Sequence, residues 1–153
     1  MATFVHRPFA ELSLRELHDL LWLRNEVFVV GQQITAEAEV DGLDPQCVHV
    51  IGRDASGDGG DGGRIVATAR IFLDKDPAKV GRVAVARDLQ HSGLGTALMI
   101  YVRDVVLAGR PSSMSAQRYL EAWYTRLGWR TVGAPYVEAE IPHVWMVRDL
   151  ATK

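Results

Sequence analysis

Cysteine is almost absent from this chain, since Cys47 is the only one among 153 residues. A single cysteine excludes an intrachain disulfide and a metal cluster held by several thiolates. The sequence also contains no His-x-x-His pair, and its acidic residues are spread over predicted loops. We therefore expect no metal site, because a bound transition metal needs several such ligands brought together.

Long apolar runs and a strong net charge are absent as well. The longest apolar run, residues 97–102, falls far short of the roughly 18–20 residues that span a bilayer, and His6, Arg7 and Pro8 interrupt any signal-peptide pattern. The 17 Lys and Arg residues nearly balance the 19 Asp and Glu residues, so neither nucleic acid nor an anionic membrane is an expected partner. We expect a soluble cytoplasmic protein with a single domain over residues 1–153.

The segment from Gly81 to Thr96 carries the most specific pattern in the chain. An apolar stretch with alternating Val and Ala is followed by a short polar turn and then by Gly93 and Gly95 at the start of an apolar helical run. A helix start presents unpaired N–H groups and a partial positive charge, and glycines let a phosphate approach them closely. The pattern therefore predicts a pyrophosphate site at the end of a strand.

Several glycine-rich signatures compete for this segment. A Walker loop requires a Gly-Lys pair, which occurs nowhere in the chain. A dinucleotide fingerprint requires a third glycine three residues after Gly95, where this chain has Leu98. A hydrolase elbow, Gly-x-Ser-x-Gly, is absent too. On these residues alone, a phosphate-dependent nucleotide binder of another fold stays open.

Hydrophobic periodicity and turn residues predict ten helices and strands. These are a strand over 4–12, a helix from the Ser13 cap to Val30, strands over 46–53, 64–73 and 80–86, a helix over 93–108, a strand over 112–117, a helix over 118–127, and strands over 131–139 and 144–150. Residues 37–44 form an acidic loop, and the glycine-rich run over 54–63 forms a hairpin loop. The order predicts an α/β fold with a mixed, mostly antiparallel sheet, one parallel pair and helices on both faces.

Five segments carry a resemblance to one known family. Gln90-His-Ser-Gly-Leu-Gly95 resembles the acyl-CoA-binding motif of the GNAT superfamily of N-acetyltransferases, and the segment 116–129 resembles its helix with Tyr shortly before a glycine and an aromatic residue. Residues 23–32, 41–44 and 139–146 resemble motifs of its ElaA-like branch. Gly31 and Glu140 depart from those motifs, because the branch has Glu and Gly there. The resemblance covers essentially the whole chain and implies the GNAT fold, with its parallel pair of strands splayed apart.

The resemblance implies that acetyl-CoA is the co-substrate. The strand Val83, Ala84 and Val85 would pair through its backbone with the pantetheine arm, in a slot opened where it splays from its parallel neighbour near residues 113–116. Gln117 would hydrogen-bond the same arm, and Tyr124 would contact the sulfur. The pyrophosphate would lie against the residues Gln90, His91, Ser92, Gly93, Leu94, Gly95 and Thr96.

The resemblance also implies two catalytic residues, Tyr124 and His143. A free phenol has a pKa near 10, so Tyr124 is protonated at neutral pH and can donate a proton to a departing thiolate. The alternative for Tyr124 is a purely structural place in an aromatic cluster. His143 is the first choice for the base that takes a proton from the amine; the other candidates are Glu26, Glu37, Glu39, Asp41 and His49.

Arg24, Asn25 and Phe28 are the expected substrate-binding residues, with structural pairing as the alternative for Arg24. The acceptor is an amine of an unidentified small molecule or peptide. The acidic loop over 37–44 favours a cationic amine, although a solvated surface explains it equally well. Because Cys47 lacks an evident base, we expect direct attack without a covalent enzyme intermediate.

Two further alternatives stay open at this point. A GNAT-fold module could bind CoA as a sensor without catalysing transfer. A homodimer is an expectation from the superfamily alone, and no feature of the sequence selects it.

Overall fold

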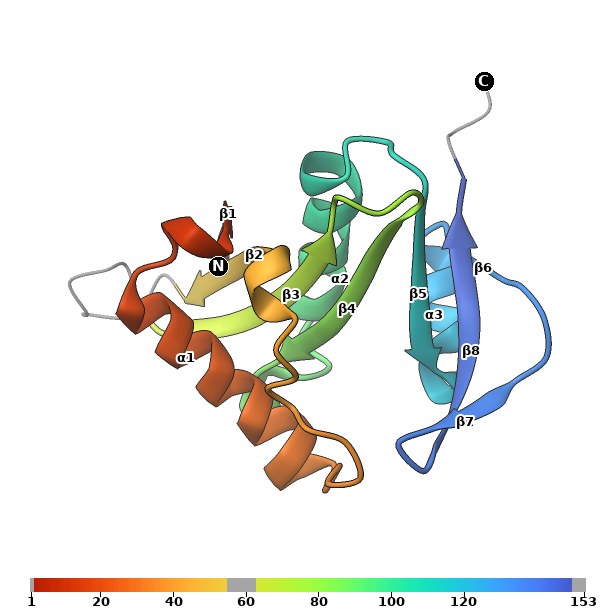
Figure 1. Ribbon diagram of the computed structural model, residues 1–153, viewed down its shortest axis with the longest axis horizontal. Coiled ribbons are helices and arrows are strands. Elements are labelled where there is room, and N and C mark those ends of the chain that lie inside the picture. Colours follow the sequence, from red (N-terminus) through yellow and green to blue (C-terminus); the bar gives the residue numbers. More distant parts are fainter. Residues whose placement is uncertain (1, 55–62, 150–153) are drawn as a thin grey trace.

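A computed structural model describes residues 2–54 and 63–149 of the chain. An eight-stranded sheet runs through it in the order β1-β2-β3-β4-β5-β8-β6, with β7 paired to β8 (Figure 1). The strands are β1 Ala2–Pro8, β2 Val48–Asp54, β3 Ile65–Phe72, β4 Ala78–Val85, β5 Ser112–Gln117, β6 Arg130–Thr131, β7 Tyr136–Glu138 and β8 Ile141–Arg148. Most of the predicted glycine-rich hairpin loop, residues 55–62, lies outside the described residues.

The sheet is mixed, as the order of elements predicts. Strands β1 to β4 form an antiparallel meander, β4 and β5 are parallel, and β5 pairs with β8 antiparallel. The parallel pairing is short: it runs from Ala78 opposite Ser112 to Val80 opposite Met114. Beyond it the two strands diverge, which divides the molecule into two halves (Figure 1). The predicted splayed parallel pair is confirmed.

A bulge in β4 accompanies this divergence. The register between β3 and β4 shifts between Thr68 and Arg70, so two residues of β4, Arg82 and Val83, stand opposite the single Ala69. Arg82 adopts a φ of 50°, an uncommon backbone conformation for a residue with a side chain. A bulge of this kind bends its strand and increases the local twist.

Helices cover both faces of the sheet, as expected. Helix α1 (Leu14–Arg24) contacts β3 and β4 on one face, and α2 (Leu94–Tyr101) contacts β1, β3 and β4 on the other (Figure 1). Both helices continue as π-helical turns, η2 (Asn25–Gly31) after α1 and η5 (Val102–Val106) after α2. Strand β3 is buried along its whole length because it lies between the two hydrophobic clusters.

The start of α1 is fixed by the predicted cap. The backbone N–H of Glu16 donates to Ser13 Oγ (3.0 Å), and the Ser13 N–H donates to Glu16 Oε1 (2.9 Å). Such reciprocal capping satisfies two donors that the helix leaves unpaired and stabilises it by about 1 kcal/mol. The cap therefore fixes where α1 begins. It thereby also helps to fix the position of η2, which follows α1 directly.

Two predicted boundaries are wrong. The strand expected over 131–139 is two short strands, β6 and β7, because Gly133 turns the backbone with a φ of 82° and Pro135 has no N–H for a ladder. The first strand ends at Pro8, where the 3-10 turn η1 (Phe9–Glu11) begins. Three more 3-10 turns are η3 (Asp44–Gln46), η4 (Arg87–Leu89) and η6 (Arg118–Leu120), the last leading into α3 (Glu121–Arg126).

Among the helices of residues 2–54 and 63–149, none is both long enough and apolar enough to traverse a lipid bilayer.

Candidate active site

A cleft of about 670 Å³ opens where β4 and β5 diverge. Its walls come from these two strands, from η2 and the loop behind it, from the start of α2, from α3 and from the β7–β8 hairpin. A volume of this size is typical of pockets that enclose a cofactor or a drug-sized ligand. The cleft is therefore large enough for an extended cofactor arm together with part of a second substrate.

The edge of β4 that faces the cleft offers backbone groups that no described strand pairs with beyond Val80, although the Val85 carbonyl accepts from Gln90 Nε2 (3.2 Å). The Ala86 N–H donates to Val66 O of β3 (2.8 Å), and alternate residues of a strand direct their N–H and C=O groups to opposite sides. Val85 and Val83 therefore turn their backbone groups away from β3, toward the side where β5 would continue. No strand among the described residues pairs with β4 there beyond Val80. This edge can accept an extended chain as an additional strand.

The glycine turn places the start of α2 at the end of this edge. Gly93 is the N-cap of α2 with a φ of 90°, and His91 has a φ of 66°. Of the first amides, Leu94 N–H has only the distant Ser92 Oγ (3.4 Å) and Ala97 N–H donates to Gly93 O (3.1 Å). Within the described part of the chain, the N–H groups of Gly95 and Thr96 have no acceptor, as expected in a first helical turn. They are free to bind an anion.

The lack of a side chain at Gly95 also matters. A Cβ there would lie 3.4 Å from the Trp123 ring and 3.6 Å from Val85 Cγ2. The Trp123 indole N–H donates to Thr96 Oγ1 (3.1 Å), which ties α3 to the start of α2. The glycine therefore permits the close contact of α2, α3 and β4 at this end of the cleft.

The structure brings most of the predicted cofactor-binding residues together. Those that line the cleft are Val83, Val85, Gln90, His91, Gly93, Gly95, Thr96, Gln117 and Tyr124. The side chain of Ala84 does not line it, because it is buried with Leu23 and Val27 on the α1 face of the sheet. Ser92 donates its hydroxyl to Leu89 O (2.5 Å), and Leu94 packs against the core. For these three residues, only the backbone is in a position to contribute.

Tyr124 lies at the floor of the cleft. Its side chain is 4% exposed and its ring packs against Trp123 (centroids 4.7 Å apart) and Trp129 (6.3 Å). The hydroxyl makes no hydrogen bond to any described residue. Burial, together with the nearby Tyr119, raises the pKa of Tyr124 above its ordinary value. The phenol therefore stays protonated and has a free donor to offer.

His143 lines the cleft from β8, opposite Gln117 in the β5–β8 ladder. Its side chain is 6% exposed, and Nδ1 lies 2.7 Å from Ile141 O. A carbonyl only accepts, so Nδ1 carries the hydrogen and Nε2 keeps its lone pair in the neutral ring. Nε2 lies 3.5 Å from Glu138 Oε2, and Ser115 Oγ donates to Glu138 Oε1 (3.2 Å). The imidazole is thus fixed in orientation beside a carboxylate.

Gln117 is held by a partner from the other half of the molecule. Its Nε2 donates to Gln32 Oε1 (3.0 Å), and Gln32 Nε2 donates back to Gln117 Oε1 (3.1 Å). This reciprocal amide pair connects the end of η2 to the end of β5 across the cleft. A pantetheine arm that hydrogen-bonds the Gln117 amide has to displace Gln32 from it.

Arg24 and Asn25 are placed away from the cleft, whereas Phe28 lines it. The Arg24 side chain is 1% exposed and donates to Glu39 Oε2 (2.8 Å) and Asp44 Oδ1 (2.8 Å). Asn25 is exposed and borders a shallow surface depression beside Trp22. Arg24 therefore has the structural pairing that was its alternative, and it does not reach a ligand in the cleft directly.

Three arginines neutralise most of the acidic loop. Arg70 joins Arg24 on Asp44 (3.1 Å) and also binds Asp41 (2.7 Å), and Arg82 binds Glu39 (2.9 Å). Hydrogen bonds from Arg70 lower the pKa of Asp41 well below its usual range. Burial would raise the pKa of Asp44, but Arg24 and Arg70 outweigh it and lower that pKa. The loop is thereby fixed against the bulged segment of β4 and forms one wall of the cleft.

The remaining candidate bases differ in whether they line the cleft and in whether other groups already occupy them. Glu37 lines the cleft, as does Glu39, but two arginines occupy Glu39 Oε2. His49 is buried, and its Nε2 lies 3.0 Å from Asp44 O. Burial lowers the pKa of the His49 imidazole. Asp41 and Glu26 are not among the residues that line the cleft.

Cys47 is buried away from the cleft, and its Sγ lies 3.4 Å from Leu43 O. Burial raises the pKa of the Cys47 thiol to about 11. A buried thiol that is protonated at neutral pH is a poor nucleophile.

Sequence reasoning missed Gln32 and Glu138 as residues of the cleft. Both depend on contacts across the sheet: Gln32 reaches Gln117 over 85 positions of sequence, and Glu138 meets Ser115 over 23 positions. Gln32 ends the 23–32 segment that resembles a family motif, but that resemblance did not assign it a role, and Glu138 stands in no local pattern. The contact of Trp123 with Thr96 likewise joins residues 27 positions apart and could not be predicted from spacing.

The chain matches known proteins over nearly its whole length. A family model described as an acetyltransferase (GNAT) domain matches residues 60–150. A Schizosaccharomyces pombe protein is 34% identical over 152 residues, covering 96% of this chain and 97% of that protein. The crystal structure of Escherichia coli ElaA has a TM-score of 0.84 at 30% identity and covers 97% of this chain and 100% of ElaA. An acyl-CoA N-acyltransferase from Pseudomonas aeruginosa has a TM-score of 0.82 at 33% identity, covering 97% and 99%.

The matched region contains the bulged strand β4, the glycine turn, the start of α2 and the splayed strand β5. These elements build much of the cleft, whereas the wall formed by η2 and the loop behind it lies outside the matched region. The chain belongs to the GNAT superfamily of acetyltransferases and is an ElaA-like protein.

Proposed function

We propose that this protein moves the acetyl group of acetyl-CoA to an amine of a small molecule or peptide, by direct attack, within one domain over residues 1–153. Membership of the GNAT superfamily supports acyl transfer. The observation that carries the proposal is the continuity of two backbone features. The unpaired edge of β4 at Val83 and Val85 leads directly to the free amides of Gly95 and Thr96, and all four residues line one cleft.

This continuity fits the shape of CoA, which joins an extended amide chain to a pyrophosphate. The pantetheine arm would pair with Val83 and Val85 as an added strand, with Gln117 as a side-chain partner. The pyrophosphate would lie on the amides of residues 90–96, at the positive end of α2. Both contacts use backbone groups, so they depend on the fold more than on particular side chains.

The reaction forms one bond and breaks one. The amine nitrogen attacks the thioester carbon, the new C–N bond forms, and the C–S bond breaks with its electron pair on sulfur. The Val83 N–H would donate to the carbonyl oxygen as it becomes negative, a contact typically worth about 3 kcal/mol in such sites. His143 Nε2 would accept the proton that the amine loses.

Tyr124 would serve the leaving sulfur. Its hydroxyl has no partner among the described residues and its raised pKa keeps it protonated. A hydrogen bond to the thiolate stabilises the charge as the C–S bond breaks, and a proton given to sulfur would be replaced from water. The buried, protonated Cys47 supports direct attack over an acyl-enzyme route.

Calorimetric titration with CoA, followed by release of the CoA thiol from acetyl-CoA in the presence of amines, tests the proposal. We expect CoA to bind in the micromolar range or tighter and thiol release to depend on an added amine. CoA binding without acetylation of any member of a panel of amines, amino acids and peptides would instead favour a catalytically silent CoA-binding module. Absence of CoA binding would contradict both.

A further inference from the structure

Besides the paired Arg82 and Glu39, the charged side chains that line the cleft are two cations from η4 and α3 and two anions from the loop behind η2 and from β7. The cations Arg87 and Arg126 stand at the end where α2 begins. Arg87 lies in η4, just ahead of the glycine turn, and Arg126 follows Trp123 by one helical turn on α3. The anions Glu37 and Glu138 line the same cleft from the loop behind η2 and from β7. A phosphate-rich ligand is favoured at the first end and disfavoured at the second.

The negative charge at the second end is not cancelled by the nearby arginines. Arg24, Arg70 and Arg82 are committed to the carboxylates of Glu39, Asp41 and Asp44. In the part of the chain that the structure describes, Glu37 forms no ion pair. Among the basic side chains of the described residues, the His143 imidazole alone lies within 4 Å of the Glu138 carboxylate (3.5 Å), and the Glu138 side chain is 44% exposed. Two carboxylates thus remain available to a ligand.

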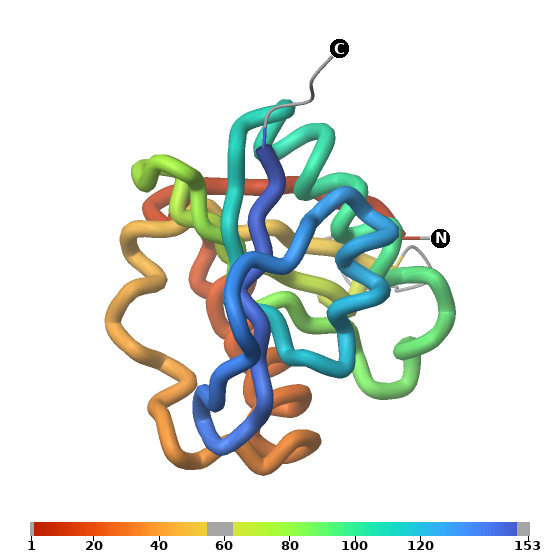
Figure 2. Tube along the Cα trace, turned by 90° about the vertical axis from the view of Figure 1, so that its right-hand side faces the viewer, coloured from red at the N-terminus to blue at the C-terminus, as the bar shows by residue number. Residues whose placement is uncertain are grey.

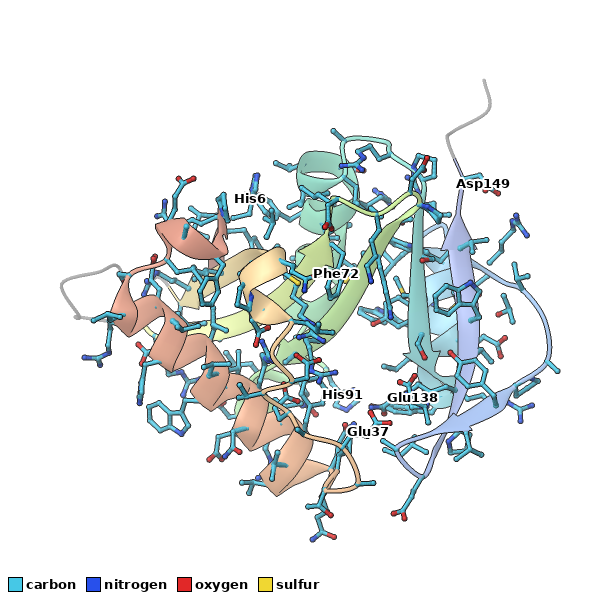
Figure 3. The ribbon with its side chains drawn as sticks, in the orientation of Figure 1. His6, Glu37, Phe72, His91, Glu138 and Asp149 are labelled. Atoms are coloured by element: carbon cyan, nitrogen blue, oxygen red, sulfur yellow. The ribbon has the colours of Figure 1, made fainter. Side chains whose placement is uncertain are left out.

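These two carboxylates approach the cleft from opposite halves of the molecule. The tip of the β7–β8 hairpin lies beside the loop that follows η2, in Figure 1 and again in the turned view of Figure 2. Figure 3 shows Glu37 and Glu138 in the space between these two segments. A group bound between the segments would therefore meet carboxylate oxygens from both sides.

Two mostly buried polar side chains line the same cleft and indicate that it receives a ligand. Tyr124 is 4% exposed, yet its hydroxyl has no hydrogen-bond partner among the described residues. His143 is 6% exposed, and its Nε2 lies 3.5 Å from Glu138 Oε2. The Tyr124 oxygen is accessible from the cleft, so a ligand there can complete its hydrogen bonding.

We infer that the acceptor is a diamine or polyamine, in which one nitrogen is acetylated and a second, protonated nitrogen lies between Glu37 and Glu138. This inference rests on the proposed acetyltransferase function and specifies its substrate class. A compact ammonium group with three donors suits two carboxylates, whereas a neutral or anionic amine gains nothing there. The same carboxylates disfavour a second phosphate-bearing ligand.

Two conjugates test the inference without depending on turnover. In one, the sulfur of CoA is joined through an acetyl bridge to 1,4-diaminobutane; in the other, it is joined to 1-aminobutane, which lacks the second nitrogen. We expect the diamine conjugate to bind about tenfold tighter by calorimetry at low salt, with about threefold from each partly exposed carboxylate. Equal affinity for the two conjugates, with both bound at least as well as CoA, would overturn the diamine inference and leave the proposed function standing.

Single substitutions show which carboxylates produce the difference in affinity between the two conjugates. Glu37→Gln and Glu138→Gln should each reduce the affinity ratio to about threefold and leave the affinity for the aminobutane conjugate unchanged. Glu37 is the sharper position because it does not contact His143. Glu140→Gln is the matched control, since Glu140 is an exposed carboxylate of the same hairpin that does not line the cleft. A ratio that stays tenfold in Glu37→Gln and Glu138→Gln would overturn the inference. Failure of CoA and both conjugates to bind would overturn the proposed function.

Discussion

Replacing Gly93 by Asp tests the phosphate-binding assignment, and Gly93→Asn is its matched control. Gly93 has a φ of 90°, and nothing lies within 4 Å of the position a Cβ would take. Either side chain thus fits without a clash. The residue must, however, adopt a left-handed backbone conformation, which costs about 1–2 kcal/mol for a residue with a Cβ. Asn and Asp tolerate this conformation better than other residues with a side chain, so the cost lies at the lower end of that range. We expect both variants to fold, with free energies of unfolding within about 1 kcal/mol of the parent.

The two variants differ only in charge. A carboxylate about 4 Å from each of two phosphate charges is repelled by roughly 2 kcal/mol even at the dielectric constant of water, which is about 30-fold in affinity. Calorimetric titration with CoA at low salt should therefore show Gly93→Asp binding about 30-fold more weakly than Gly93→Asn. Added salt should narrow the difference. Equal affinities for CoA in the two variants would refute the placement of the pyrophosphate at the start of α2.

Three further outcomes are expected. Tyr124→Phe should lower kcat about 10- to 100-fold and change CoA affinity little, because the lost hydroxyl acts on the departing sulfur; steady-state kinetics that match the parent would leave Tyr124 as packing alone. Asp44→Asn should lower the free energy of unfolding in urea by about 3 kcal/mol, because two buried guanidinium groups lose a carboxylate; an unchanged urea midpoint would contradict this. The pKa values of Asp41 and Asp44 are lowered in the folded protein, so their contribution to the free energy of unfolding is complete above the unfolded-state pKa near 3.9. This contribution is lost as the pH falls below that value toward the lowered pKa of the folded state. Urea midpoints should thus drop more steeply between about pH 4 and 2 in the parent than in Asp44→Asn.

Much of the fold could be predicted because its signals are local. The capping box at Ser13 and Glu16, the alternation in β4 and the glycines around α2 each act within a few residues. The parallel pairing of β4 with β5 followed from the order of the elements, whereas the splaying of this pair followed from the family resemblance. The segment 131–139 was misread as one strand because its apolar residues outweighed Gly133 and Pro135, which break the ladder.

The residues of the site could be predicted only where their backbone position determines their role. Val83, Val85, Gly93 and Gly95 lie in the cleft because the turn and the strand dictate their positions. Side chains whose contacts lie far apart in the sequence were harder to place. Arg24 follows the family motif in sequence, yet burial directs it to Glu39 and Asp44, since an arginine inside the protein needs carboxylate partners.

Amide hydrogen exchange with and without CoA tests most directly whether the β4 edge and the start of α2 form the cofactor site. The amides of Val83, Val85, Gly95 and Thr96 lack acceptors in the described structure, so we expect them to exchange quickly in the free protein and to slow at least tenfold when CoA saturates it. The amides that pair β1 with β2 should change little beyond the general stabilisation that binding brings. Saturation with CoA that leaves all four amides exchanging at their original rates would contradict the central claim.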